Sequence, residues 1–298
     1  MEIEKRKQGK KTKFYLAQST RIGKKVTKIR RYLGSNLTKK DIEKLLPKAR
    51  VLLQKKMEEH KNPLLFELTA EEINLYRKYD SRIKISHLKK GGWKKFTEKF
   101  TYNTNAIEGS TISASDVNDI LRKKSTPLND EEVESVNVAN ALEYIKVTKE
   151  ELSTKLMNKL HKLCFHGTKH FAGKLREVHV LIKDANGNII HEGANPDELG
   201  ELLKRLCKWY SLHKNVYSPL LLASVIHNQF EKIHPYQDGN GRVGRLLLNY
   251  VLLKHKYPPV NIYLNDRIRY YECLRIFDKY GDVKPTLKFL INQYKKQR

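Results

Sequence analysis

Residues 234–245 have the sequence HPYQDGNGRVGR, and its residue types could together handle a polyphosphate. Gly239, Gly241 and Gly244, with Asn240 between the first two, allow the backbone to bring N–H groups close to an anion. Because an apolar helical pattern follows directly, these N–H groups would lie at the start of a helix, where anions are favoured. The segment is therefore predicted to cradle phosphate groups.

Four side chains in the same segment add the groups that transfer chemistry requires. Arg242 and Arg245 are three residues apart, so on the first turn of a helix they lie on one side and can hold successive phosphates. Asp238 supplies the hard oxygen that Mg²⁺ prefers beside a polyphosphate. His234 is the natural general base, because the ordinary pKa of histidine, near 6.5, suits proton removal at neutral pH.

The plain alternative is a glycine-rich turn with a surface histidine and two surface arginines. Such a turn requires neither the carboxylate nor the paired arginines, so the complete set favours a nucleotide site. A Walker-type phosphate loop is excluded, because no Gly-Lys-Ser/Thr follows the glycines.

Two apolar helical patterns flank this segment. SPLLLASVIHNQFEKI precedes it and RLLLNYVLLKHKY follows it, both with apolar residues three and four apart, as in buried helices. The helical pattern extends from about Gly91 to the C-terminus. Its one interruption, LREVHVLIKDANGNIIHEG, predicts a β-hairpin that turns at Asn186-Gly187. The fold class is therefore predicted to be mainly α, a helical bundle with a projecting hairpin.

The first part of the chain has a different pattern. KFYLAQST and KVTKIRRYLG are two β-like runs separated by RIGK, which predicts another hairpin. Thr38 and Thr69 each have an acidic residue three positions later, the spacing of a capping box at a helix start. Pro47 is expected to kink or break the first of these helices. We expect residues 1–90 to form a small α+β region and residues 91–298 a separate catalytic domain.

The formal charge of the 298 residues is +26, and it is concentrated near the start. Residues 1–40 contain fourteen Lys and Arg against two Glu. Such a field favours nucleic acid or acidic protein partners, although a basic face also simply keeps a protein solvated. No stretch approaches the roughly 18 apolar residues of a membrane-spanning helix, and no apolar run follows the basic start as in a secretory signal. We expect no membrane association and a cytoplasmic location.

Three cysteines, Cys164, Cys207 and Cys273, are odd in number and far apart. This spacing argues against a disulfide framework or a thiolate zinc site. His161, Cys164 and His166 lie close together in KLHKLCFHG, where metal binding is the alternative to packing within a helix.

At residues 234–245 the chain resembles the Fic (Fic/Doc) family, whose signature is His-x-Phe-x-Asp/Glu-Gly-Asn-Gly-Arg-x-x-Arg. Every position matches except Tyr236, which replaces phenylalanine and should have little effect on the chemistry. The resemblance covers roughly residues 95–295. It includes a Gly-x-x-Arg segment at Gly173 and Arg176, a hairpin at 176–193 where the family has its target-docking flap, and DRIRYYECLRIFDKYGDVKP, similar to the last core helices.

The resemblance implies a protein adenylyltransferase, which transfers AMP from ATP to a Tyr, Thr or Ser hydroxyl of a target protein and releases pyrophosphate. His234 would deprotonate the hydroxyl, and Asp238 would hold Mg²⁺ on the α- and β-phosphates. The remaining phosphate contacts would come from the backbone of Gly239, Asn240 and Gly241 for the α-phosphate, from Arg242 for the β-phosphate and from Arg245 for the γ-phosphate.

Base specificity is less strongly implied than the chemistry. Tyr271 matches a residue near the adenine in relatives, whereas Asp278 falls near a position where Asn is common. Another nucleotide donor is therefore an open alternative.

TNAIEG at residues 104–109 matches the family's inhibitory pattern Ser/Thr-x-x-x-Glu-Gly/Asn, here N-terminal to the catalytic segment (class II type). A salt bridge from Glu108 to Arg245 would occupy the cation that the γ-phosphate requires. In some relatives this glutamate positions a water that removes AMP, so deAMPylation is an alternative use of the same site.

A rival function of another class is a nucleic-acid-binding adaptor that uses the basic N-terminal region. Phe14, Tyr15 and Tyr32 lie near basic residues, although no named nucleic-acid motif is present. The sequence also leaves a homodimer open.

Overall fold

The computed structural model divides the chain into two compact units, Met1–Glu67 and Leu68–Arg298. It describes residues 1–9, 11–22, 25–61, 64, 66, 68–80, 88, 91–183 and 189–297. Among the helices of these ranges, none combines the length and the apolar character that crossing a membrane requires.

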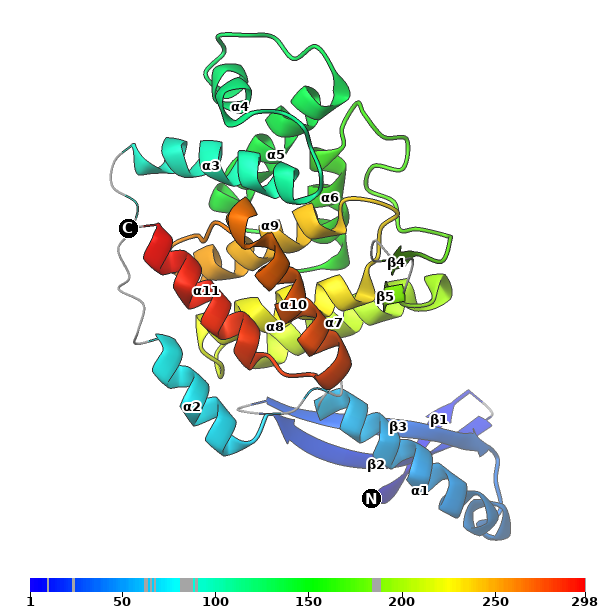
Figure 1. Ribbon diagram of the computed structural model, residues 1–298. Helices are drawn as coiled ribbons and strands as arrows, with labels where there is room; N and C mark the ends of the chain where they lie inside the picture. Colours follow the sequence, from blue (N-terminus) through cyan, green and yellow to red (C-terminus); the bar gives the residue numbers. More distant parts are fainter. Residues whose placement is uncertain are drawn as a thin grey trace. The chain divides into compact units, whose positions relative to one another are not determined.

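The N-terminal unit is a three-stranded antiparallel sheet with one helix (Figure 1). Its elements are β1 (Glu2–Gln8), β2 (Lys11–Ile22), β3 (Lys25–Ser35) and α1 (Lys39–Lys61), and the strand order is β1-β2-β3. Leu16 and Ile29 of the sheet form a small core with Ala49 and Leu53 of α1. Burial of these apolar side chains stabilises the packing of the helix on the sheet.

The predicted pairing of the two β-like runs is confirmed, because β2 and β3 are antiparallel from Lys13 opposite Ser35 to Ile22 opposite Lys25. The turn between them lies outside the described residues. β1 was not expected. It has few apolar residues and is joined to the sheet partly by charge, since Glu4 accepts a hydrogen bond from Arg30 of β3. Arg30, together with Arg6 of β1 itself, lowers the pKa of Glu4 to about 2.

Helix α1 begins at the predicted capping box, where the Thr38 backbone N–H donates to Asp41 at 2.9 Å. The helix then continues through Pro47, so of the expected kink or break, the break is wrong. Pro47 is exposed, so water can reach the carbonyl that its missing N–H leaves without a partner.

The second unit is helical. Its helices are α2 (Ala70–Asp80), α3 (Gly92–Ile107), α4 (Ala114–Leu121), α5 (Asp130–Val147), α6 (Thr154–Cys164), α7 (Leu199–His213), α8 (Pro219–Ile233), α9 (Asn240–Lys254), α10 (Arg267–Tyr280) and α11 (Lys284–Lys296). Two short 3₁₀ turns, Pro196–Glu198 and Leu264–Asp266, precede α7 and α10. Mainly α architecture with a small N-terminal sheet confirms the predicted fold class.

Helices α8 and α9 lie in the middle of this unit, where α3, α5, α6, α7, α10 and α11 contact one or both of them (Figure 1). Every residue of α9 from Asn240 to Leu252 is buried. A helix that is buried on all sides is held in place by neighbours on every face. The loop between α8 and α9 carries residues 234–239 of the predicted site, so the site is fixed from both ends.

The predicted hairpin within this unit is formed by β4 (Leu181–Lys183) and β5 (Ile189–Glu192), which pair antiparallel. Its proposed turn at Asn186-Gly187 lies outside the described residues.

Helix α2 belongs to the helical unit, although the sequence pattern placed residues 1–90 in one region. It packs on α8 and α11 and buries Tyr76 and Tyr79. Its start has the predicted capping contacts between Thr69 and Glu72.

Candidate active site

The loop after α8 begins with His234 in the left-handed backbone region, at φ 52°. Arg176 holds this conformation in place, because its Nε donates to the His234 carbonyl at 2.8 Å and its backbone N–H donates to the Pro235 carbonyl at 3.0 Å. The other guanidinium nitrogens of Arg176 donate to the carbonyls of Val178 and Ala194, at the two sides of the hairpin base. One buried arginine thus joins the loop to the hairpin.

Tyr236 and Asn240 brace the loop from inside. The Tyr236 N–H donates to Asn240 Oδ1 and Asn240 Nδ2 donates back to the Tyr236 carbonyl, both at 2.8 Å. The Tyr236 ring is fully buried and stacks on His161 at 3.9 Å between centroids. Its hydroxyl donates to Asn158 Oδ1 at 2.9 Å, so the hydroxyl that replaces a hydrogen of the usual phenylalanine is satisfied.

His161 is a structural support of the same loop. The Gly173 N–H donates to its Nδ1 at 2.7 Å, which leaves Nε2–H to donate to the Asp238 carbonyl at 3.1 Å. Burial lowers the pKa of His161 to about 4, consistent with a neutral ring. Because both ring nitrogens are engaged, the contacts favour packing over metal binding for the cluster of His161, Cys164 and His166.

Two glycines allow close approaches that any side chain would block. Gly239 directly precedes α9 at φ 76°, and a Cβ there would meet the Phe165 ring at 2.1 Å. A Cβ on Gly241 would meet Glu108 Oε1 at 2.2 Å. The Glu108 carboxylate therefore lies directly against the first turn of α9, where backbone N–H groups lack partners within the helix.

His234 is half-buried and neutral. Burial, the nearby His191 ring and Arg176 lower its pKa to about 4, against weaker opposing effects of the Glu231 carbonyl and Glu108. His234 Nδ1 lies 3.3 Å from the Glu231 carbonyl, so Nδ1 carries the proton and Nε2 is left with a lone pair.

His191 links the hairpin to α10. Its ring centroid is 5.5 Å from that of His234, and its Nδ1 lies 2.9 Å from Asp278 Oδ2. Asp278, singled out in the sequence as a departure from Asn, is thus engaged by the hairpin as well as by Lys232.

Asp238 is half-exposed at the loop surface. The Gly239 N–H donates to its Oδ1 at 2.6 Å, and its Oδ2 lies 3.6 Å from Arg242 Nη2. One oxygen is thereby oriented by the backbone while the other faces Arg242.

Arg245 is buried with every guanidinium nitrogen in contact with a partner. Its Nε donates to Thr104 Oγ1 at 2.7 Å, and its Nη2 donates to the Thr104 carbonyl at 2.9 Å and to Glu108 Oε1 at 2.8 Å. Nη1 lies 3.5 Å from the Tyr270 hydroxyl. Burial acts to lower the pKa of Arg245, but Glu108, together with Tyr270 and Glu231, more than offsets this, so the pKa is raised.

Arg242 is buried too and pairs with another carboxylate. Its Nη1 donates to Glu134 Oε2, and its guanidinium carbon lies 4.3 Å from the centre of the Phe165 ring. Glu134 belongs to α5, far from Arg242 in the sequence.

Residues 151–252 match the sequence model of the Fic/DOC family. The chain carries a Fic/DOC domain. It is 31% identical over 197 residues to the protein adenylyltransferase Fic of Drosophila ananassae, and this alignment covers 63% of this chain and 38% of that protein. It is 28% identical over 259 residues to the protein of the same name from Nematostella vectensis, which covers 83% of this chain and 56% of that protein. The chain thus spans only about two fifths to three fifths of the length of these relatives.

A solved structure of a Fic-domain-containing signaling protein from Bacteroides thetaiotaomicron VPI-5482 is also similar. It has a TM-score of 0.65 and 26% sequence identity, and the alignment covers 75% of this chain and 92% of that one.

The Fic/DOC domain brings the predicted site residues together. His234, Asp238, Gly239, Asn240, Gly241, Arg242 and Arg245 all lie on the loop and the first two turns of α9, and Glu108 reaches them from the end of α3. Tyr271 is half-exposed on α10, and its hydroxyl donates to the Ile107 carbonyl at 3.0 Å, next to Glu108.

Sequence reasoning missed Glu134, His191 and the buried group behind Arg245. That group is formed by His227, Glu231 and Tyr270. His227 Nε2 lies 2.9 Å from the Tyr270 hydroxyl, and burial raises the pKa of Glu231 to about 8. No local motif marks these residues, because each lies in an ordinary helical or strand pattern and meets the site only through the fold.

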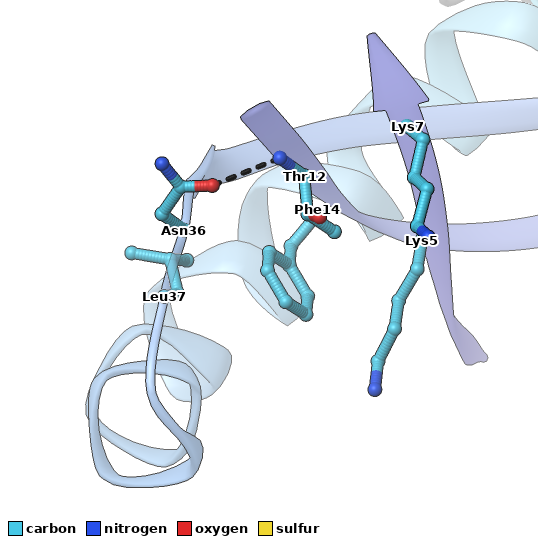
Figure 2. A pocket seen from close by; sticks show the side chains of 6 residues that line it. All are labelled: Lys5, Lys7, Thr12, Phe14, Asn36 and Leu37. Atoms are coloured by element: carbon cyan, nitrogen blue, oxygen red, sulfur yellow. Dashed lines mark hydrogen bonds between the residues drawn. The ribbon is translucent and has the colours of Figure 1, made fainter. Parts of the chain in front are cut away.

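The N-terminal unit has a pocket of its own. It has a volume of about 610 Å³ and is lined by Lys5, Lys7, Thr12, Phe14, Asn36 and Leu37. Figure 2 shows both lysine side chains on β1, beside the Phe14 ring and the hydrogen bond from the Thr12 N–H to Asn36 Oδ1.

Proposed function

We propose that the Fic/DOC domain transfers AMP from ATP to a hydroxyl of a target protein. The observation that carries this proposal is a neutral, partly exposed His234 next to a helix start with two fixed arginines. The two relatives named protein adenylyltransferase Fic support the same activity.

In the proposed reaction, His234 Nε2 accepts the proton of the target hydroxyl while its Nδ1–H stays bonded to the Glu231 carbonyl. The hydroxyl oxygen forms a bond to the α-phosphorus of ATP, and the bond from that phosphorus to the oxygen bridging to the β-phosphate breaks. Pyrophosphate leaves with the bonding electron pair. First-turn N–H groups of α9 stabilise the α-phosphate, and Arg242 and Arg245 hold the β- and γ-phosphates.

Asp238 fits the role of a magnesium ligand. Its carboxylate is half-exposed and fixed by the Gly239 N–H, and Mg²⁺ is commonly held by one or two carboxylates together with substrate phosphates. Within the described residues no group of three or more His, Cys, Asp or Glu could hold a metal without such phosphates. Bound Mg²⁺ would supply neutralisation of phosphate charge.

Glu108 is proposed to inhibit the resting enzyme. It pairs with Arg245 and lies against Gly241, so it occupies both the cation for the γ-phosphate and part of the space at the helix start. The same carboxylate could orient a water for AMP removal, so deAMPylation is the alternative direction. Neither the nucleotide base nor the target is specified by these contacts.

The test measures transfer of labelled AMP with MgATP by wild type, Glu108→Gly and Glu108→Gly/His234→Ala. The single variant should raise self-modification or target modification at least tenfold, and the added His234→Ala should abolish it. An unchanged rate in Glu108→Gly would contradict inhibition. Retained transfer without His234 would remove it as the base. Offering each nucleoside triphosphate in turn identifies the donor.

The hairpin formed by β4 and β5 is proposed to dock the target. An extended target segment can add to a strand edge through backbone hydrogen bonds, and His191 places this hairpin beside His234. Docking of this kind tolerates sequence variation in the target.

A cytoplasmic location remains a prediction from the sequence.

A second candidate function, nucleic-acid binding, is favoured by the basic pocket of the N-terminal unit (Figure 2). Lys5 and Lys7 are exposed on one face of β1, with Thr12 on the neighbouring strand, a suitable arrangement for successive phosphates. Lys5→Glu/Lys7→Glu should weaken duplex binding. The slope of the logarithm of the binding constant against the logarithm of the salt concentration should become shallower by roughly two. The matched control is Lys44→Glu/Lys48→Glu on exposed positions of α1. Equal loss in both variants would show that only net charge matters.

A further inference from the structure

Arg242 and Arg245 are both buried and both paired with a glutamate, but the two pairs use different edges of the guanidinium. Glu134 contacts Nη1 of Arg242 and makes no contact with the edge formed by Nε and Nη2. On Arg245 that same edge is occupied, because Nε contacts Thr104 Oγ1 and Nη2 contacts Glu108. The Nε–Nη2 edge presents two parallel donors, the fork that matches a phosphate.

The Nε–Nη2 edge of Arg242 points away from Glu134 and lies beside Asp238. Its Nε is buried without a hydrogen-bond partner among the residues that the structure describes, and its Nη2 is 3.6 Å from Asp238 Oδ2. A buried donor without a protein partner is costly, which favours its use in binding a ligand group. Since Asp238 is the proposed magnesium ligand, the edge is directed toward the polyphosphate.

Glu134 and Glu108 differ in their position within a helix and in their exposure. Glu134 lies inside α5, is 7% exposed, and its second oxygen accepts the Thr168 hydroxyl at 3.0 Å. Glu108 caps the end of α3, its side chain is 25% exposed, and Gly109 follows at φ 97°. Glu134 is therefore fixed, whereas Glu108 can leave Arg245 by a local movement of the helix end.

We propose that Glu134 is a positioning residue that turns the Nε–Nη2 edge of Arg242 toward the second phosphate of the nucleotide and remains paired while the nucleotide is bound. The proposal rests on the proposed function. Glu134 differs from an inhibitory carboxylate, since it balances the buried charge of Arg242 without occupying the phosphate-facing donors.

The test compares binding of AMP, ADP and a non-hydrolysable ATP analogue by calorimetry, in Glu108→Gly and in Glu108→Gly/Glu134→Gln. ADP and the ATP analogue should bind at least tenfold more weakly when Glu134 is replaced, while AMP affinity should stay within twofold. Asp130→Asn, which removes an exposed charge from the same helix, is the control and should change none of the three. Equal weakening of AMP, no change, or tighter ADP binding would each overturn the proposal.

A double-mutant cycle shows whether Glu134 acts through Arg242. In an Arg242→Ala background, Glu134→Gln should have no further effect on ADP affinity, whereas a general structural role would lower affinity again. Melting temperatures are measured for each protein. If Glu134→Gln does not fold, Glu134→Asp takes its place, because it keeps the charge but withdraws it from Nη1.

The binding pattern and the reaction can fail separately. If Glu108→Gly binds nucleotides but transfers no AMP, the proposed function is wrong while the discrimination between ADP and AMP still decides the role of Glu134. If transfer occurs and the discrimination is missing, only the role of Glu134 is wrong.

Discussion

His234 owes its suitability as a base to its neighbours. The Glu231 carbonyl fixes the proton on Nδ1, so the lone pair of Nε2 is available in a single orientation. Burial and the nearby His191 and Arg176 lower the pKa of His234 to about 4. At neutral pH the ring is therefore fully in its neutral form, which is the form that accepts a proton.

This pKa predicts how transfer depends on pH. A base acts when deprotonated, so its contribution is complete above its pKa and is lost as the pH falls through it. We expect kcat/KM of the Glu108→Gly variant to show no titration of His234 between pH 5.5 and 8. Steady-state rates across this range, with saturating Mg²⁺, provide the measurement. An acid limb with a midpoint near 6.5, the ordinary pKa of histidine, would show that the environment of His234 has been misjudged.

Arg245 illustrates what a residue pattern can and cannot reveal. The spacing of Thr104 and Glu108 predicted the contact with Arg245, and the structure places both residues on its guanidinium. Glu134 was missed although its pair with Arg242 is equally buried. It is one of four acidic residues in DEEVE, and only the packing of α5 against α9 selects it.

At the scale of elements, the end of α3 is held from two sides. Glu131 of α5 accepts hydrogen bonds from the Ser110 hydroxyl and from the backbone and hydroxyl of Thr111, contacts that lower its pKa. On the other side, the Tyr271 hydroxyl donates to the Ile107 carbonyl. Both contacts stabilise the turn that places Glu108 on Arg245.

Loosening that turn should release part of the inhibition. Glu131→Gln keeps the shape of the side chain but replaces one carboxylate oxygen with an amide group and removes the charge, weakening contacts worth about 1–2 kcal/mol in total. We expect AMP transfer between the rates of wild type and Glu108→Gly, measured with the same labelled ATP. Asp130→Asn, one residue earlier and exposed, serves as the control and should match wild type. A Glu131→Gln protein with a wild-type rate and a lower melting temperature would mean that Glu131 stabilises the fold without controlling Glu108.

Elements were predictable where the sequence carried a local signal. The strong apolar patterns around residues 234–245 predicted α8 and α9, and the capping boxes at Thr38 and Thr69 marked two helix starts. β1 could not be found this way, because a strand held partly by Glu4 and its arginine partners has no apolar alternation. The continuity of α1 through Pro47 was not predicted either, because proline is disfavoured inside a helix.

For the whole molecule, the division into two units separates two kinds of surface. All proposed catalytic, nucleotide-binding and inhibitory residues belong to Leu68–Arg298, and the basic pocket belongs to Met1–Glu67. The N-terminal unit has its own small core around Leu16 and Leu53. A unit of that size buries a smaller fraction of its surface than a larger one and is correspondingly less stable.

The division predicts that AMP transfer survives removal of the N-terminal unit. Residues 68–298 carrying Glu108→Gly should fold, as judged by circular dichroism, and should modify themselves or a target within threefold of the rate of the full-length variant. The same fragment with His234→Ala is the matched control and should be inactive. Because the basic pocket is absent from the fragment, nucleic-acid binding that depends on Lys5 and Lys7 should disappear while transfer persists. A folded fragment that binds ATP but no longer transfers AMP would show that the N-terminal unit contributes to the reaction itself.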